Sequence, residues 1–231
     1  QKGRYRQFVQ CDIDIIGDAT ELAEVELLTA SLSALANIGL ADATIRVNHR
    51  ALLASNIAAL GVPADQAGSA MITIDKLDKV GVEGVATELA DKFGAAVADK
   101  ATAWLNGLQG ELAVPAELAN VFAAVHAIHP GKLRFDPTLV RGMGYYTGPI
   151  FEIEHPESGS SIGGGGRYDG MVGRWLGTDA PAVGISIGFE RAVDLLPEPA
   201  ANAGGVLLIL ADESAEVLAH ALNLQGKLIA A

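Results

Sequence analysis

Apolar and polar residues alternate at the start of the chain. Within residues 8–17, "FVQCDIDIIG", the apolar set is Cys11, Ile13 and Ile15, and the polar set is Gln10, Asp12 and Asp14. Successive side chains of a strand point to opposite faces. This stretch therefore predicts a half-buried strand whose polar face carries one amide and two carboxylates.

Helical spacing follows this strand. From Thr20 to Ile38 apolar residues recur every three or four positions, and Gly39 supplies a stop signal. The stretch 42–49 alternates again as a strand, and 49–61 predicts a second helix that ends in glycine. The chain therefore begins as a mixture of strands and helices.

The middle of the chain changes character. Residues 63–120 are rich in Ala and predict helices, so we expect a helical subdomain inserted between two halves of a sheet. A further amphipathic helix over 115–130 ends at Pro130, and short alternating stretches then return, separated by Pro and Gly. Their hairpin-like spacing favours an antiparallel sheet. The predicted fold class is α+β.

The last residues predict a further unit. Residues 197–205, "PEPAANAGG", have the composition of a linker. A buried strand is expected over 206–212 and a helix over 213–231. A strand followed by a helix would begin an α/β domain.

Composition narrows the function classes. The 231 residues carry a formal charge of −12, which argues against broad electrostatic attraction to nucleic acid, although Lys2, Arg4 and Arg6 form a local basic cluster. The single Cys11 excludes an internal disulfide framework and fits a reducing compartment. No apolar run reaches the roughly 18 residues of a membrane helix. We expect a cytoplasmic protein without a membrane partner.

Candidate chemistry lies in polar residues near the predicted strand ends. Carboxylates at Asp12 and Asp14 suit a cationic ligand group, and an arginine fork suits phosphate oxygens. The other candidates follow strands of the second half, and they are Arg141, Tyr145, Tyr146, Arg167, Tyr168, Glu190 and Arg191. Together they suggest a ligand that is both an amine and a phosphate.

Each of these features also has a purely structural interpretation. The aspartates of the first strand can be the solvated face of a sheet, and Arg4 can be a surface charge. Tyr145 and Tyr146 can divide between core and surface, and Glu190 with Arg191 can be a first-turn charge pattern. The four glycines of "SSIGGGGRYDG" could be a linker, but they lie between strand-like stretches and match neither a dinucleotide nor a P-loop motif. The histidines lack metal-ligand spacing, so no protein metal site is expected.

Read in order, four stretches resemble histidyl-tRNA synthetases, which are class II aminoacyl-tRNA synthetases. Residues 1–17 resemble the second half of motif 2, and 181–196, "PAVGISIGFERAVDLL", resemble motif 3. Residues 139–152, "LVRGMGYYTGPIFE", and 163–173, "GGGGRYDGMVG", resemble the two histidine signatures. Gly144 stands where the first signature has Asp. The resemblance covers nearly the whole chain, but motif 1 and the motif 2 arginine are missing, which indicates a catalytic-core fragment of a longer polypeptide.

The resemblance implies a histidine pocket. Gln10 and Asp14 would hold the α-amino group, with Asp14 where the family commonly has Glu. Tyr145 and Tyr146 would line the imidazole pocket, and Tyr168 would close it.

The resemblance also implies a nucleotide site. Arg4 would contact the ATP phosphates, and Arg191 would lie against the adenine and reach toward the γ-phosphate. Arg141 would be the catalytic cation that binds the α-phosphate and the histidine carboxylate. The four consecutive glycines, with Gly164 and Gly165 at their centre, would form a strand under the amino acid, where side chains would collide with it.

The implied reaction is ATP-dependent activation of histidine to histidyl-adenylate, followed by transfer to tRNA(His), with Mg²⁺ bridging the phosphates. The implied partner of the full-length protein is a second copy, in a homodimer. The alternative is a synthetase-like regulatory subunit of ATP phosphoribosyltransferase, which senses histidine without catalysis. The expected division is a first core part at 1–47, a helical insertion at 48–120, a second core part at 121–200 and the start of an anticodon-binding-type domain at 201–231.

Overall fold

The computed structural model describes residues 7–141, 144–197, 210, 212 and 214–229. The chain divides into two compact units, 1–196 and 197–231. The predicted strand at 206–212 falls almost wholly outside the described residues. In the second unit the expected helix is present as α9 (Ala215–Ile229). The four boundaries expected from the sequence remain predictions.

The first unit is built on a six-stranded sheet in the order β1-β6-β5-β4-β2-β3. All neighbouring strands pair antiparallel except β2 and β3, which are parallel. The predicted α+β class with a mainly antiparallel sheet is confirmed. The strands are β1 (Gln10–Ile16), β2 (Thr44–His49), β3 (Leu133–Phe135), β4 (Pro149–Glu154), β5 (Gly163–Arg167) and β6 (Ala182–Gly188).

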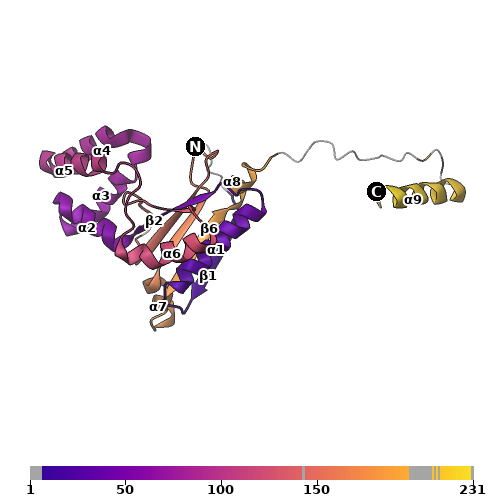
Figure 1. The fold of residues 1–231 in the computed structure, drawn as a ribbon, viewed down its shortest axis with the longest axis horizontal. Helices are drawn as coiled ribbons and strands as arrows, with labels where there is room; N and C mark the ends of the chain where they lie inside the picture. Colours follow the sequence, from indigo (N-terminus) through magenta and orange to yellow (C-terminus); the bar gives the residue numbers. More distant parts are fainter. Residues whose placement is uncertain (1–6, 142–143, 198–209, 211, 213, 230–231) are drawn as a thin grey trace. The chain divides into compact units, whose positions relative to one another are not determined.

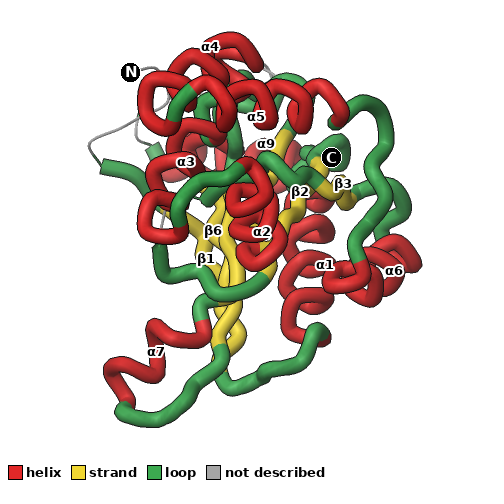
Figure 2. The backbone as a smooth tube through the Cα atoms, turned by 90° about the vertical axis from the view of Figure 1, so that its left-hand side faces the viewer, coloured by secondary structure: helices red, strands yellow, loops and turns green. Residues whose placement is uncertain are grey.

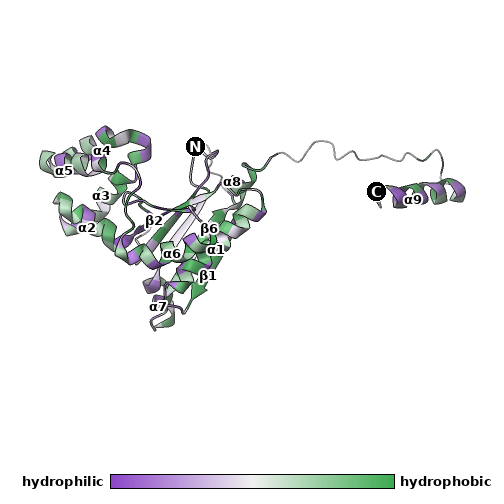
Figure 3. Cartoon of the chain, viewed as in Figure 1, coloured by the Kyte–Doolittle hydropathy of each residue, from purple (hydrophilic) through white to green (hydrophobic). Residues whose placement is uncertain are grey.

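Helices α1 (Leu22–Asn37) and α6 (Ala119–Ile128) cover one face of this sheet (Figures 1 and 2). The predicted helix from Thr20 begins two residues later, because the Thr20 amide donates to Asp18 Oδ1 at 2.7 Å and closes a turn first. Gly39, with φ +95°, ends the helix as expected. Figure 3 colours α1 and β1 largely hydrophobic, as expected for elements that share a core.

The core between sheet and helices takes alternate residues of the strands, except that β5 is mostly glycine and contributes no apolar side chain. From the strands it receives Ile13, Ile15, Ile45, Val47, Phe151, Ile153, Val183, Ile185 and Ile187, and from α1 it receives Leu27, Leu28, Leu32 and Leu35. The alternation predicted for β1 is therefore present, with its isoleucines turned to the core. The other face of the sheet is left for polar residues and glycines.

The predicted helical insertion is a group of helices with a core of its own. It comprises α2 (Arg50–Leu60), α3 (Ala67–Ile74), α4 (Leu77–Phe93) and α5 (Ala95–Gly107). Their shared core includes Leu53, Ile57, Ile74, Val85, Leu89 and Ala101. Figure 1 shows the group beyond the β2 side of the sheet. Helix α2 ends at Gly61, with φ +94°, as the sequence predicts.

Short elements complete the first unit. They are the 3₁₀ turns η1 (Ala64–Gln66) and η2 (Ala116–Leu118) and the helices α7 (Asp169–Leu176) and α8 (Phe189–Val193). Helices α7 and α8 follow β5 and β6 closely, so each of these two strands leads into a short helix. No helix in the described ranges is both long and apolar enough to cross a membrane.

Candidate functional site

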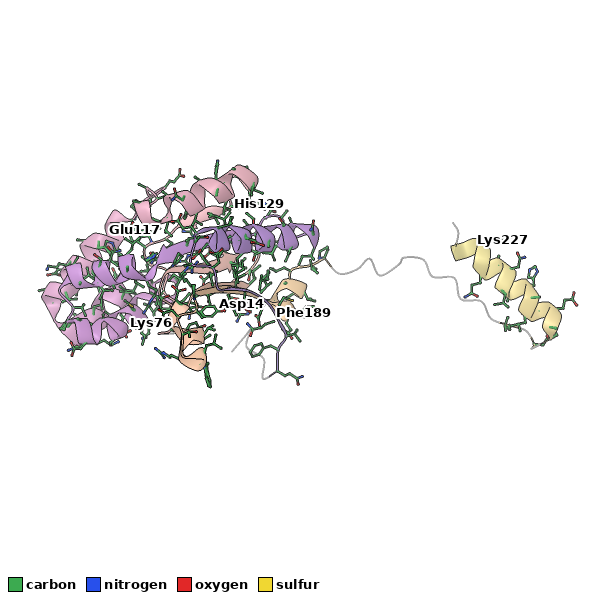
Figure 4. The ribbon with its side chains drawn as sticks, turned by 90° about the horizontal axis from the view of Figure 1, so that it is seen from below. Asp14, Lys76, Glu117, His129, Phe189 and Lys227 are labelled. Atoms are coloured by element: carbon green, nitrogen blue, oxygen red, sulfur yellow. The ribbon has the colours of Figure 1, made fainter. Side chains whose placement is uncertain are left out.

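The face of the sheet opposite α1 carries the candidate site. The strand register aligns Asp12, Ser186, Gly164 and Glu152 across four neighbouring strands. The next row along these strands aligns Asp14 with Gly184, Gly166 and Ile150. Glycines therefore occupy the middle of the face, while carboxylates stand at both sides. In Figure 4 Asp14 lies among the strands, whereas His129 lies on the helical layer.

The glycines of β5 form a strand, as the resemblance implied. Two of them, Gly164 and Gly166, leave room for side chains of the protein itself. A Cβ on Gly164 would fall 1.4 Å from Arg141 Nη2, and one on Gly166 would fall 2.8 Å from Tyr146 Cδ1. Because the side-chain period is two, Gly165 points to the other face, where its Cβ would meet the Gly184 carbonyl oxygen at 1.9 Å. The floor is therefore lined by backbone on which Arg141 and Tyr146 rest.

Arg141 is held flat over this floor. Its Nε donates to the Phe151 carbonyl at 3.0 Å, and Nη2 donates to the Gly163 carbonyl at 2.6 Å. Nη1 lies 3.6 Å from Glu152 Oε2. A guanidinium has five N–H donors, so these three contacts still leave one donor each on Nη1 and Nη2 for an anionic ligand. Arg141 is thus held in place as a cation at the cleft; its role toward a ligand, which the resemblance implies, remains a prediction.

Asp14 and three tyrosines form a connected cluster at the other end of the glycine floor. The Tyr168 hydroxyl donates to Asp14 Oδ1. The Tyr145 ring lies 4.4 Å from the Tyr146 ring and edge-on to the Tyr168 ring at 6.2 Å. Burial first, and then the neighbouring oxygens, raise the pKa of the Tyr146 and Tyr168 hydroxyls above the usual value. Both hydroxyls therefore remain donors at neutral pH.

A cleft of about 340 Å³ opens beside Arg141. Gln10 Nε2 donates to Ser186 Oγ at 2.5 Å, which leaves the Gln10 carbonyl oxygen as an acceptor. Arg191 also lines the cleft, and its Nη1 donates to the Ser161 carbonyl at 2.5 Å. The cleft is lined by Phe8, Val9, Gln10, Arg141, Ser161, Ile162, Gly163, Gly164, Ser186, Gly188, Glu190 and Arg191.

The structure brings most of the predicted residues together. Gln10, Arg141, Gly164 and Arg191 line the cleft, and a second set of Asp14, Tyr145, Tyr146 and Tyr168 makes contacts within itself. Gly165 belongs to the same strand but points to the other face. Arg4 lies outside the described residues. No group of three metal-ligating side chains occurs in the described ranges.

Sequence reasoning missed two polar residues of this face. Ser186 and Glu152 lie in stretches dominated by apolar residues. Only the strand register, which aligns both residues with Gly164, shows that they share a face with the glycines. Glu190 was assigned either to the ligand site or to a helix charge pattern. It lines the cleft, and its two carboxylate oxygens accept from the Val9 amide at 2.9 and 3.1 Å, a contact without a local sequence signal.

Solved structures share this architecture. A crystal structure of histidyl-tRNA synthetase from Nostoc sp. PCC 7120 matches 98% of this chain and 60% of its own, with a TM-score of 0.75 at 25% identity. A Bacillus halodurans structure, described as an ATP phosphoribosyltransferase regulatory subunit/histidyl-tRNA synthetase, covers 85% of this chain and 55% of its own with a TM-score of 0.70. At 21% identity it shows the fold alone. The fold and its glycine-floored cleft define a class II aminoacyl-tRNA synthetase type of domain.

The sequence comparisons show which family of class II synthetases the chain resembles. A model of the histidyl-tRNA synthetase family matches residues 1–192. The histidine–tRNA ligase of Leifsonia xyli subsp. xyli is 49% identical over 100% of this chain and 58% of its own length. The histidine–tRNA ligase of Aeropyrum pernix is 38% identical over 84% of this chain and 48% of its own. The chain belongs to the histidyl-tRNA synthetase family, and it spans about half the length of the curated relatives it matches.

Proposed function

We propose that this chain forms the amino-acid and ATP site of a histidine–tRNA ligase. The observation that carries the proposal is the division of one sheet face into two ends. Asp14 offers carboxylate oxygens at one end, opposite Gly184. Arg141 and Arg191 offer guanidinium donors in the cleft at the other end, where Gln10 lies opposite Gly188. A ligand with an ammonium group and a phosphate would satisfy both ends at once.

The first step joins histidine to ATP. A carboxylate oxygen of histidine attacks the α-phosphorus, the bond to the bridging oxygen breaks, and pyrophosphate leaves with that electron pair. Negative charge accumulates on the α-phosphate in the transition state, so the donors of Arg141 would stabilise it. Asp14 and Gln10 would hold the ammonium group, and this would orient the carboxylate for attack.

The second step transfers the histidyl group. A hydroxyl of the 3′-terminal adenosine of tRNA(His) attacks the acyl carbon, and AMP leaves. Mg²⁺ would enter with ATP as part of the substrate, because it prefers phosphate oxygens and water to an all-protein cage. We infer a homodimer and a cytoplasmic location for the full-length protein. Light scattering would test the dimer.

Side-chain geometry supports an imidazole pocket beside Asp14. The Tyr145, Tyr146 and Tyr168 rings cluster there, and the hydroxyls of Tyr146 and Tyr168 stay protonated at neutral pH. Aromatic faces and hydroxyl donors together suit a flat, polar ring. Histidine is therefore the amino acid we propose.

Calorimetric titration of the 231-residue chain tests this function. The ligands are L-histidine, L-histidinol, which lacks the carboxylate, and a non-hydrolysable histidyl-adenylate analogue. We expect the analogue to bind more tightly than histidine. Asp14→Ala should weaken all three ligands, and Arg141→Ala should weaken histidine and the analogue far more than histidinol.

Two exposed residues serve as matched controls. Asp91→Ala and Arg174→Ala remove the same charges away from the site and should leave all affinities unchanged. If histidine binds but the adenylate portion adds nothing, the regulatory alternative replaces the ligase. If the chain binds none of the three ligands, the proposed site is wrong.

A further inference from the structure

A second charged cluster lies beside the candidate site. Arg46 of β2, whose side chain is 9% exposed, donates from Nε to Asp136 Oδ2 at 2.8 Å. Its Nη1 lies 3.1 Å from carboxylate oxygens of Asp78, Glu152 and Glu154. Asp78 belongs to α4 of the helical insertion, so this arginine ties that group of helices to the sheet.

Glu152 is the member of this cluster that also lies near Arg141, a lining residue of the cleft. Its Oε1 accepts from Arg46 Nη1 at 3.1 Å, while its Oε2 lies 3.6 Å from Arg141 Nη1. The strand register makes Glu152 the direct neighbour of both Arg46 and Gly164. Its side chain is 18% exposed, so the carboxylate is largely shielded from water. Glu152 is therefore the residue through which the Arg46 cluster meets Arg141.

The Arg141 guanidinium has protein neighbours at each of its three nitrogens. The Phe151 and Gly163 carbonyls hold Nε and Nη2, and Gly164 leaves room beneath Nη2. These carbonyls are neutral, so they accept hydrogen bonds from Nε and Nη2 but do not compensate the positive charge of the guanidinium. The Glu152 carboxylate lies on the Nη1 side, and Arg46 holds it in place.

We propose that Glu152 is a positioning residue for Arg141. It fixes the guanidinium plane over Gly164, and it compensates the charge of two neighbouring arginines. The donors of Arg141 that remain then face the cleft before a ligand arrives. This inference rests on the proposed function, because it assigns Glu152 to the anion-binding end of the same site.

A positioning role differs from a general structural role in its ligand selectivity. A misplaced Arg141 would weaken ligands that carry a carboxylate or phosphate, but it would leave an amine without either nearly untouched. A general loss of structure would weaken all of them. Comparing histidinol with the adenylate analogue therefore separates the two.

The test is calorimetric titration of Glu152→Gln with histidinol and with the adenylate analogue, using the whole chain. Glu154→Gln is the matched control, since Glu154 lies on the same strand and face and contacts Arg46 at the same 3.1 Å. Its other partner is Arg134, at 3.0 Å, on the side away from Arg141. We expect Glu152→Gln to lower analogue affinity about tenfold or more, as for a hydrogen bond to a charged group. Histidinol affinity should change by less than about twofold.

A double-mutant cycle completes the experiment. If Glu152 acts through Arg141, Glu152→Gln should weaken the analogue no further once Arg141→Ala is present. Equal effects of Glu152→Gln and Glu154→Gln, an equal loss for histidinol, or full additivity in the cycle would each overturn the inference.

The same data separate this inference from the proposed function. If Arg141→Ala abolishes selectivity for the analogue while Glu152→Gln leaves it intact, only the role of Glu152 is wrong. If the unmodified chain does not prefer the analogue over histidinol, the proposed function is wrong and the inference falls with it.

Discussion

Replacing Gly164 by alanine should separate folding from ligand binding at this site. The added Cβ would lie 1.4 Å from Arg141 Nη2, 2.3 Å from its Cζ and 2.6 Å from the Phe151 carbonyl oxygen. Contacts under 3 Å with a backbone oxygen cannot be relieved by rotating a side chain alone. The guanidinium must leave its place over the floor, and the strand must shift slightly.

Two magnitudes follow from this collision. Overpacking of this kind costs about 1–3 kcal/mol of unfolding free energy, so the variant should still fold. Displacing Arg141 removes hydrogen bonds to a charged group, worth about 1.5–3 kcal/mol, from the bound state. The adenylate analogue should therefore bind about tenfold to a hundredfold more weakly.

Urea denaturation and calorimetric titration would measure the two effects. Gly170→Ala in α7 is the control, because a Cβ there meets nothing within 4 Å and its backbone is not left-handed. It should bind the analogue normally and lose no stability. If Gly164→Ala binds the analogue within about twofold of the unmodified chain, Arg141 does not depend on this glycine and the reasoning is wrong.

Two further predictions concern buried charges. Arg167→Met leaves the Glu24 carboxylate, 2% exposed, without its bidentate partner at 2.5 and 2.7 Å, so urea denaturation should show a loss of about 3–5 kcal/mol. A loss below about 1 kcal/mol would contradict it. Burial raises the pKa of Asp136, but hydrogen bonds from Thr138 and the charge of Arg46 outweigh it and hold the pKa below the usual 3.8. Such a carboxyl stabilises the fold above its unfolded pKa and loses this effect as the pH falls, so Asp136→Asn should flatten the decline of Tm below pH 3.8. An unchanged acid slope would contradict that assignment.

The local sequence pattern was sufficient to predict features that depend on a single helix or strand. Alternation alone placed Gln10 and Asp14 on one face of β1 and the isoleucines on the other. Gly39 and Gly61 correctly marked helix ends, because a left-handed backbone at a helix terminus favours glycine. These predictions needed no partner strand.

The remaining contacts of the site could not be predicted, because they depend on which strands pair and in which register. The sequence did not indicate that Gly164 also leaves room for Arg141, which is held there by the carbonyls of Phe151 on β4 and Gly163 on β5. Glu190 bonds the amide of Val9, a residue 181 positions away. Ser186 orients Gln10 only because β1 and β6 are neighbours. The periodicity of a single element does not predict contacts between residues so far apart in the sequence.

The anion-binding end of the cleft favours the ligase over a histidine sensor. Arg141 donates to the Gly163 carbonyl and Arg191 donates to the Ser161 carbonyl, so both cations are fixed on one short segment at the start of β5. Holding a long arginine side chain in one geometry costs up to about 2 kcal/mol of side-chain entropy. A protein that senses histidine needs one such cation for the carboxylate. Two, both held in the same cleft by carbonyls of residues 161–163 before a ligand arrives, suit a ligand that extends from a carboxylate into phosphates, and this is the ligand that an adenylate-forming enzyme binds.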